Sequence, residues 1–249
     1  MDAVSAGLLA AQNQAVRLFA EVVDGGLIQP GKLESELSVE IHQLAKERFG
    51  VNRHWHKRIV RAGPNTLLTF QDTAKDRRIL DDDVVYLDFG PVFNAWEADF
   101  GRTYVVGTDS EKHRLVTDIG TAFKRGKELY EQTPNLTAGE LYDYVVDLAR
   151  RAGWEFGAST AGHLIGHFPH ERPPPNTRRF SIRHGNGVSL REPDAQGNTR
   201  HWILEIHFVD HSRRIGGFCE ELLTVNGDAP AQRLPRHSRQ GSLKFNDFS

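Results

Sequence analysis

The stretch VVYLDFGPVFNAWEADFGRTYVV, residues 84–106, is typical of two β-strands joined by a turn. Apolar, β-branched residues dominate both of its ends, as in buried strands. Asp88 and Asp99 stand eleven positions apart inside these runs, where an unpaired carboxylate is costly. Alone, the two aspartates could also be turn or edge residues. Neighbouring antiparallel strands can carry both on one face, however, and this arrangement predicts a bound cation.

Composition sets the class of protein. A chain of 249 residues accommodates one large α/β domain or two small ones. A net charge of −2, with both signs interspersed, gives no electrostatic footprint for nucleic acid or a membrane surface. The single cysteine, Cys219, excludes a disulfide framework and a thiolate zinc site within the chain. With no secretory signal and no membrane-spanning stretch in the sequence, we expect a cytoplasmic protein.

Apolar periodicity predicts helices over about 4–23, 32–50, 111–131 and 138–152. We expect strands near 57–61 and in the two aspartate-bearing runs, then short strands alternating with turns from 155 to 225. Residues 1–226 are predicted to form one catalytic domain. The polar segment 227–249 is predicted to be an extended or mobile tail.

One segment of the chain resembles another. PGKLESELSVEIHQLAKERFG, from Pro30, and PNLTAGELYDYVVDLARRAGW, from Pro134, align at a shift of 104 positions. Each segment follows a predicted helix and precedes predicted strands. Amphipathic helices can resemble one another by chance, but the repeated order of helix, helix and strands favours a single pseudo-symmetric domain. A metal site at the junction of the two halves would draw ligands from both.

Further candidate ligands lie in three later segments. AGHLIGHFPHERPPP, residues 161–175, contains His163, His167 and His170, and spacing alone does not say which one binds metal. The run RPPPN that follows suggests a rigid, exposed rim. Glu205 stands in the apolar strand WILEIHFVD, with His207 on the same face. In GGFCEELLTV only one of two adjacent glutamates can face the site, and we expect it to be Glu220.

The motifs LDFG…ADFGRT, GHLIGHFPHERP, LEIHF and CEELLTV together resemble the metallopeptidase family of methionine aminopeptidases, prolidases and aminopeptidase P, which also includes the metal-free creatinases. The resemblance spans roughly residues 5 to 226. It implies an α/β "pita-bread" fold, in which a curved antiparallel sheet with pseudo-twofold symmetry is flanked by helices. The predicted internal repeat agrees with that fold.

The resemblance also implies roles for individual residues. Asp88 resembles the family's first aspartate ligand and Asp99 the bridging one. His163 resembles the histidine ligand, because His170 follows it at the spacing of the family's substrate-contacting histidine. Glu205 resembles the glutamate that handles the proton of the attacking water. The bridging glutamate is expected at Glu220, which completes the metal set Asp88, Asp99, His163, Glu205 and Glu220.

The chain departs from the family pattern in three places. Where the methionine aminopeptidases have a histidine before the first aspartate, this chain has LLTFQD around Phe70. His54 or His56 could replace it, or RHWHKR could be a basic surface turn. His207 follows Glu205 closely, where the family usually has proline, and the separate N-terminal domain of prolidases is expected to be absent. Arg102 could bind a substrate carboxylate or lie at a sheet edge.

These residues predict a hydrolase in which two divalent ions activate a water that attacks the amide bond of a small peptide. Oxygen-rich ligation with one imidazole suits Mn²⁺, with Co²⁺, Fe²⁺ or Zn²⁺ as alternatives. His170, Glu205 and His207 are the expected catalytic residues. A creatinase-like hydrolase of a small non-peptide substrate is the alternative, and a non-catalytic binding module is a third reading. Neither nucleic acid nor membrane is an expected partner, and the resemblance implies a homodimer.

Overall fold

The computed structural model describes residues 2–170 and 179–225. The predicted RPPPN rim and the predicted tail, 227–249, lie outside these ranges. Within residues 2–170 and 179–225, none of the helices combines the length and apolar character that crossing a bilayer requires.

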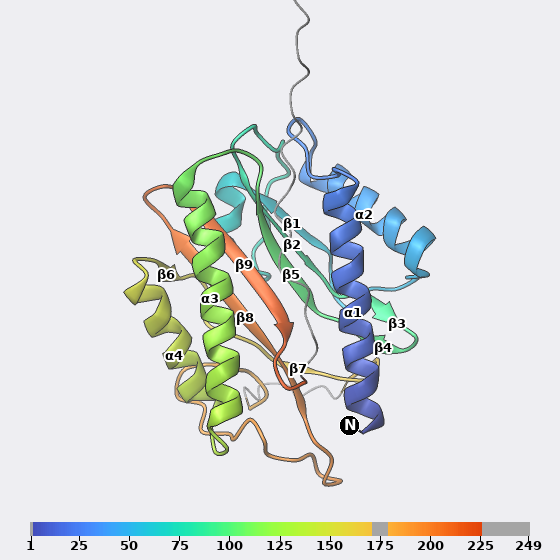
Figure 1. Ribbon diagram of the computed structural model, residues 1–249, viewed down its shortest axis with the longest axis vertical. Helices are drawn as coiled ribbons and strands as arrows, with labels where there is room; N and C mark the ends of the chain where they lie inside the picture. The colour runs from blue at the N-terminus through green and yellow to red at the C-terminus, as the bar shows by residue number, and fades with distance from the viewer. Residues whose placement is uncertain (1, 171–178, 226–249) are drawn as a thin grey trace, which may run out of the picture.

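A seven-stranded antiparallel sheet forms the centre of the described part of the chain (Figure 1). Its principal strands lie in the order β1-β2-β5-β9-β8-β6, and β7 pairs with β8. The bounds are β1 Ile59–Ala62, β2 Val84–Phe89, β5 Phe100–Val105, β6 Glu155–Phe156, β7 Leu164–Ile165, β8 His201–Asp210 and β9 Ile215–Leu222. Each half of the chain therefore contributes one side of the sheet, and the halves meet where β5 pairs with β9.

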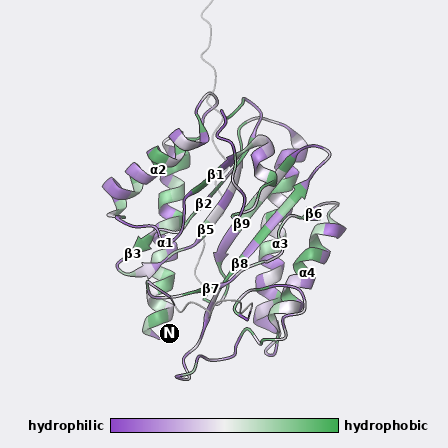
Figure 2. Ribbon diagram, turned by 180° about the vertical axis from the view of Figure 1, so that it is seen from behind, coloured by the Kyte–Doolittle hydropathy of each residue, from purple (hydrophilic) through white to green (hydrophobic). Residues whose placement is uncertain are grey.

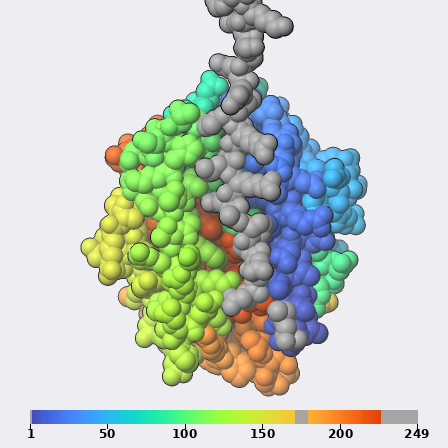
Figure 3. Space-filling model, viewed as in Figure 1, coloured from blue at the N-terminus to red at the C-terminus, as the bar shows by residue number. Residues whose placement is uncertain are grey.

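Two pairs of helices cover one face of this sheet: α1 (Ala3–Asp24) with α2 (Glu34–Phe49), and α3 (Ser110–Gln132) with α4 (Ala138–Arg151). A 3-10 turn spans Gly63–Leu67. Figure 2, from behind, shows the opposite face of the sheet turned to the viewer. In Figure 3 the two helical pairs form separate masses, with atoms of the red-coloured strands visible between them. All four helices agree with the sequence prediction to within about two residues.

The predicted repeat is visible at the starts of α2 and α4. The Glu36 carboxylate accepts a hydrogen bond from the Leu33 backbone N–H at 2.7 Å, and Glu140 accepts one from the Thr137 N–H at 2.9 Å. This contact satisfies a backbone donor that a helix N-terminus otherwise leaves unpaired. The two contacts lie 104 positions apart, so the sequence shift corresponds to equivalent helix starts.

The connection between β2 and β5 differs from the predicted turn. A small hairpin of β3 (Val92–Phe93) and β4 (Trp96–Glu97) stands between them, and Asp99 immediately precedes β5. Asn94 and Ala95 form its tip, with positive φ angles of 49° and 68°. The prediction of two strands is confirmed, but their joining by a turn alone is wrong, because the intervening residues pair with one another.

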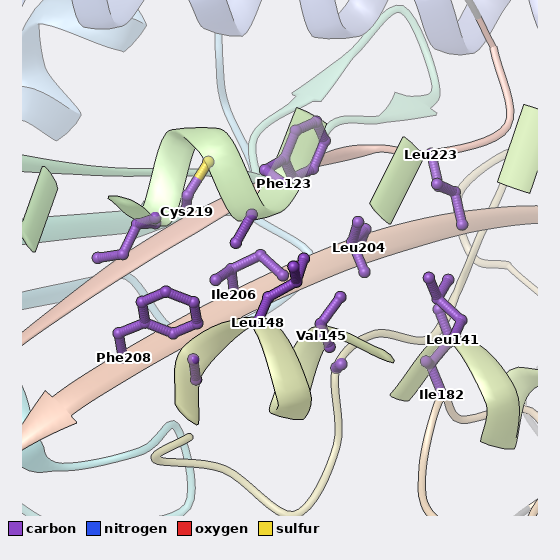
Figure 4. Packing of buried hydrophobic residues seen from close by; sticks show 14 of the residues in the cluster. Phe123, Leu141, Val145, Leu148, Ile182, Leu204, Ile206, Phe208, Cys219 and Leu223 are labelled. Carbon is purple, nitrogen blue, oxygen red and sulfur yellow. The ribbon is translucent and has the colours of Figure 1, made fainter. Parts of the chain in front are cut away.

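Strand alternation in β8 separates the core from the opposite face of the sheet. Leu204, Ile206 and Phe208 are fully buried and pack with α3 and α4 (Figure 4). Each such side chain contributes roughly 2–3 kcal/mol of burial free energy. The alternate residues Glu205 and His207 consequently point to the other face. The helix-side core thereby determines which acids of the sheet can face a common cavity.

Candidate metal centre

Carboxylates lie in one row across four adjacent strands. Asp88 in β2 is opposite Gly101 in β5, Gly101 is opposite Glu220 in β9, and Glu220 is opposite Glu205 in β8. Directly opposed residues of antiparallel strands place their side chains on the same face. Asp99 lies two positions before Gly101, so strand alternation gives it the same face. The row gathers all four predicted acids.

Gly101 makes room in the middle of this row. A Cβ atom at this position would lie 2.5 Å from Cε1 of Phe218 and 3.0 Å from Cβ of Glu220. Both separations are shorter than the contact distance of non-bonded carbon atoms, about 3.5–4.0 Å. A side chain here would displace the glutamate of β9, so glycine is required for the row to close.

Two imidazoles flank the Asp99 carboxylate. Nε2 of His163 lies 3.2 Å from Oδ2 of Asp99, 3.3 Å from Oε1 of Glu205 and 3.9 Å from Oε1 of Glu220. Nε2 of His56 lies 2.9 Å from the other oxygen of Asp99, Oδ1, and 3.6 Å from Oδ1 of Asp88. The five predicted ligand residues therefore converge, together with His56, whose role the sequence left open.

The cluster forms one wall of a cavity of about 420 Å³. All seven predicted metal and catalytic residues line it: Asp88, Asp99, His163, His170, Glu205, His207 and Glu220. Aromatic residues form much of the remaining lining, namely Trp55, Phe70, Tyr86, Phe180 and Phe218. The cavity thus combines an acidic wall with an apolar one, which is typical of a small-molecule site.

Burial strongly shifts the pKa values of the acids in this wall of the cavity. It raises the pKa of Asp88 from 3.8 to about 7, and it raises the pKa of Glu205 and, more strongly, of Glu220. Burial also acts to raise the pKa of Asp99, but the imidazoles of His56 and His163 outweigh it and hold this pKa below its usual range. Without metal, burial therefore disfavours the charged form of three acids of the row.

In His56 and His163 the raised pKa favours the charged form of the side chain, in contrast to the acids. Burial opposes a charge on His56, yet Asp99 and Asp88 outweigh burial and raise its pKa to about 9. Burial likewise opposes a charge on His163, but the hydrogen bond to Asp99 and the charge of Glu205 raise its pKa to about 10. In the absence of a metal ion, imidazolium charge thus offsets part of the negative charge of the row.

The donor set fits divalent metal ions. Among the described residues, Oδ1 of Asp88 and Oε2 of Glu220 are buried without a hydrogen-bond partner, which is costly for a carboxylate in any role other than ligation. Two groups of ligand atoms lie within 4.8 Å of one another: His56, Asp88 and Asp99, and Asp99, His163 and Glu220. Asp99 belongs to both groups.

His170 is held by a residue that the sequence analysis missed. Glu97, at 1% exposure, accepts hydrogen bonds from the His170 backbone N–H at 3.1 Å and from its Nδ1 at 2.6 Å. Nε2 of His170 is the remaining ring nitrogen. The signal was present in the sequence, since Glu97 is a carboxylate among apolar residues two positions before Asp99, but its partner lies 73 positions away.

Trp55 connects the histidines of the site. Its ring centroid lies 4.5 Å from that of His56, 5.5 Å from that of His163 and 5.3 Å from that of His170, each edge-on. Its indole Nε1 donates a hydrogen bond to the Ala98 carbonyl at 3.0 Å. Trp55 therefore holds three imidazoles in place from one side of the cavity.

Of the remaining histidines, His207 lines the cavity as expected. Its Nε2 donates a hydrogen bond to the Thr66 carbonyl at 2.9 Å. His54 packs against His42 and Phe89, and burial lowers its pKa to about 3. His167 stacks edge-on with Trp96 at 5.0 Å. Neither His54 nor His167 lines the cavity.

The two suggestions for Arg102 are both wrong. Arg102 neighbours Gly101, so it points to the opposite face from the acids, and β5 is a central strand. Its guanidinium pairs with Glu221 and donates to the Glu220 carbonyl at 3.1 Å. Glu221 also interacts with Gln12 of α1. Glu221 thus lies on the helix side of the sheet, whereas Glu220 lines the cavity.

Comparison with known proteins finds relatives among Xaa-Pro dipeptidases. The chain is 31% identical to a Xaa-Pro dipeptidase of Pyrococcus furiosus over 148 residues, which cover 59% of this chain and 41% of that protein. It is 27% identical to a Xaa-Pro dipeptidase of Lactobacillus helveticus over 175 residues, covering 70% and 45%. The chain thus spans less than half the length of these curated relatives.

Solved structures show the same fold. The prolidase from Pyrococcus furiosus superposes with a TM-score of 0.71 at 24% identity, over 91% of this chain and 63% of that one. Methionine aminopeptidase from Rickettsia prowazekii superposes with a TM-score of 0.65 at 17% identity, over 88% and 95%. The expected pita-bread architecture is confirmed. The family model described as metallopeptidase family M24 matches residues 6–203, and the chain belongs to that family.

Proposed function

We propose that the protein is a dinuclear metal-dependent hydrolase that cleaves an amide bond of a small peptide, in the manner of an aminopeptidase or a Xaa-Pro dipeptidase. The observation that carries this proposal is the row of Asp88, Glu220 and Glu205 on one sheet face, with Asp99 and His163 beside it. Membership of a metallopeptidase family and the Xaa-Pro dipeptidase relatives support the same reaction class.

Asp88, Asp99, His163, Glu205 and Glu220 would hold the two ions. Glu205 and Glu220 stand directly opposite each other, and like charges in such a pair destabilise a sheet, so ionisation of both requires a cation. Mn²⁺ suits this oxygen-rich set best, and Co²⁺, Fe²⁺ and Zn²⁺ are alternatives. When bound, the two ions would supply an acidified water and stabilise negative charge on the scissile carbonyl.

Glu205 is proposed to accept the proton of the attacking water and to deliver it to the leaving amine. Its side chain is 17% exposed, against 9% for Asp88, 2% for Asp99 and 3% for Glu220. It is therefore the most accessible carboxylate of the cluster from the cavity. A group that exchanges protons with water and substrate has to be reachable in this way, whereas a ligand that only bridges can be fully enclosed.

His170 is proposed to donate a hydrogen bond from Nε2 to the substrate carbonyl as it acquires negative charge. The buried carboxylate of Glu97 engages Nδ1 and thereby fixes the ring. His207 is assigned a second contact with substrate, because it lines the cavity two positions from Glu205. A cavity of about 420 Å³ has room for a dipeptide or tripeptide.

The test is a hydrolysis panel of dipeptides and tripeptides, run on metal-stripped protein with and without added Mn²⁺. We expect turnover only with metal, and Glu205→Gln measured at saturating metal should lower it by about 10²–10⁴-fold. The matched control is Glu155→Gln, an exposed glutamate of β6, which should retain full turnover. Metal-independent turnover, or full turnover by Glu205→Gln with the fold intact, would overturn the proposal.

A further inference from the structure

The segment that carries His56 is fixed against the β2–β5 connection. The Trp55 backbone N–H donates to the Gly90 carbonyl at 2.8 Å, and the Val92 N–H donates to the Arg53 carbonyl at 3.0 Å. His56 itself is strongly buried, with a side-chain exposure of 8%. The predicted alternative of a basic surface turn is therefore wrong for this residue, which is built into the wall of the cavity.

His56 and His163 are arranged around Asp99 in the same way. Nδ1 of His56 donates to the carbonyl of the next residue, Lys57, at 2.7 Å, and Nδ1 of His163 donates to that of Leu164 at 2.8 Å. Each ring thus donates from Nδ1 to a backbone carbonyl and turns Nε2 to a different oxygen of Asp99. A carbonyl partner on the far nitrogen is what orients histidines that bind metals.

The distances also suit coordination. Two ligand atoms about 2.1 Å from a shared ion, at right angles to each other, lie about 3.0 Å apart. Nε2 of His56 lies 2.9 Å from Asp99 and 3.6 Å from Asp88, and Oδ1 of Asp88 has no hydrogen-bond partner among the described residues. The same three residues form one of the two candidate ligand groups.

We propose that His56 is a sixth metal-binding residue of this protein. With Asp88 and Asp99 it holds one divalent ion, while Asp99, His163 and Glu220 hold the other. This inference rests on the proposed function, because it requires a site that binds two metal ions. It changes the chemistry of that centre, because each ion acquires one imidazole. Nitrogen ligation shifts preference from Mn²⁺ towards Co²⁺, Fe²⁺ and Zn²⁺ at the His56 site.

The competing role for His56 is that of a cation that pairs with Asp99. The two roles predict opposite effects of removing the imidazole. If His56 is a ligand, its replacement weakens the binding of one ion. If it only supplies positive charge, its replacement removes a competitor for Asp99 and Asp88, and metal binds at least as tightly as before.

The experiment is a Co²⁺ titration of metal-stripped full-length protein, followed by calorimetry and by proton NMR of the paramagnetic form. Wild type should bind two ions and show two shifted, exchangeable Nδ1–H resonances from coordinated histidines. His56→Gln should show one such resonance, with one ion bound at least about 100-fold more weakly. The matched control is the neighbour His54→Gln, which should retain both resonances and both affinities.

The outcomes separate this inference from the proposed function. Two ions but only one imidazole resonance in wild type would overturn the role of His56 and leave the dinuclear hydrolase intact. Undiminished Co²⁺ binding by His56→Gln would do the same. Failure of wild type to bind two ions would overturn both proposals. The resonance count in wild type needs no substitution, so a folding defect of the variant does not prevent the test.

Discussion

Replacing Asp88 by asparagine should stabilise the metal-free protein, although it removes a proposed ligand. Burial raises the pKa of Asp88 from 3.8 to about 7. Between these values the folded protein keeps a proton that the unfolded chain releases, so stability falls as pH rises through this window. A pKa difference of this size corresponds to roughly 4 kcal/mol. Asparagine is neutral at every pH and escapes this loss.

The magnitude can be measured as a difference between two pH values. From pH 5 to pH 8, the free energy of unfolding of Asp88→Asn should rise relative to wild type by roughly 3 kcal/mol. The value is an upper estimate, because the charged His56 loses one of its two carboxylate partners in the variant. The assay is urea unfolding followed by far-UV circular dichroism, in the presence of a chelator.

Added metal should reverse the order of stability. An ion at 1,000 times its dissociation constant stabilises the folded state by about 4.1 kcal/mol, and the variant loses this contribution at one site. The control is Asp83→Asn, which breaks a 3.0 Å ion pair with Arg77 away from the cavity lining. Because Asp83 is buried and also accepts a hydrogen bond from the Leu80 N–H, this variant should lose about 1–3 kcal/mol, by the same amount at both pH values. If Asp88→Asn is less stable than wild type by an equal amount at both pH values, the predicted pH dependence is wrong and Asp88 has a structural role.

Two further substitutions test residues that position the side chains of the site without binding metal themselves. Glu97→Gln should lower turnover by roughly 10–100-fold at unchanged metal content, because His170 loses its anionic partner; turnover equal to wild type would contradict this. Gly101→Ala places a Cβ 2.5 Å from the Phe218 ring and 3.0 Å from Cβ of Glu220. It should cost about 1–3 kcal/mol in urea unfolding and weaken Co²⁺ binding, whereas an unchanged Co²⁺ titration would refute the steric argument.

The helices could be predicted from the sequence because their signals are local. Apolar periodicity and the glutamates at the starts of α2 and α4 act within a few residues of each helix. Strand alternation likewise sufficed to predict that only one of Glu220 and Glu221 faces the site. These features depend on contacts between near neighbours in the chain, so they can be predicted from a short stretch of sequence.

The row of acids could not be placed in the same way. It exists because β9 lies between β5 and β8, and the pairing of Gly101 with Glu220 joins residues more than a hundred positions apart. Spacing within one strand says nothing about such a partner. The same limit explains why Glu97 was missed and why His56 stayed undecided, since the partner of Glu97 and the oxygens facing His56 come from distant segments.

The position of the row gives the proposed metal ions a structural part as well. Asp88 comes from the first half of the chain, and Glu205 and Glu220 come from the second. Within the described strands, β8 and β9 are registered at eight residue pairs, whereas β5 and β9 are registered at the single pair Gly101–Glu220. The Thr103 hydroxyl supplements that contact by donating to the Phe218 carbonyl and accepting from its N–H.

The junction of the halves therefore combines sparse backbone pairing with four closely spaced ionisable acids. Both features weaken the metal-free sheet at the same place, since each acid that ionises there adds like charge and few ladder hydrogen bonds oppose the repulsion. Ions shared between Asp99 of one half and Glu220 of the other would neutralise the charge and tie β5 to β9. Metal binding should thus stabilise the contact between the halves more than either half alone, so hydrogen exchange in β5 and β9 should slow most when metal is added.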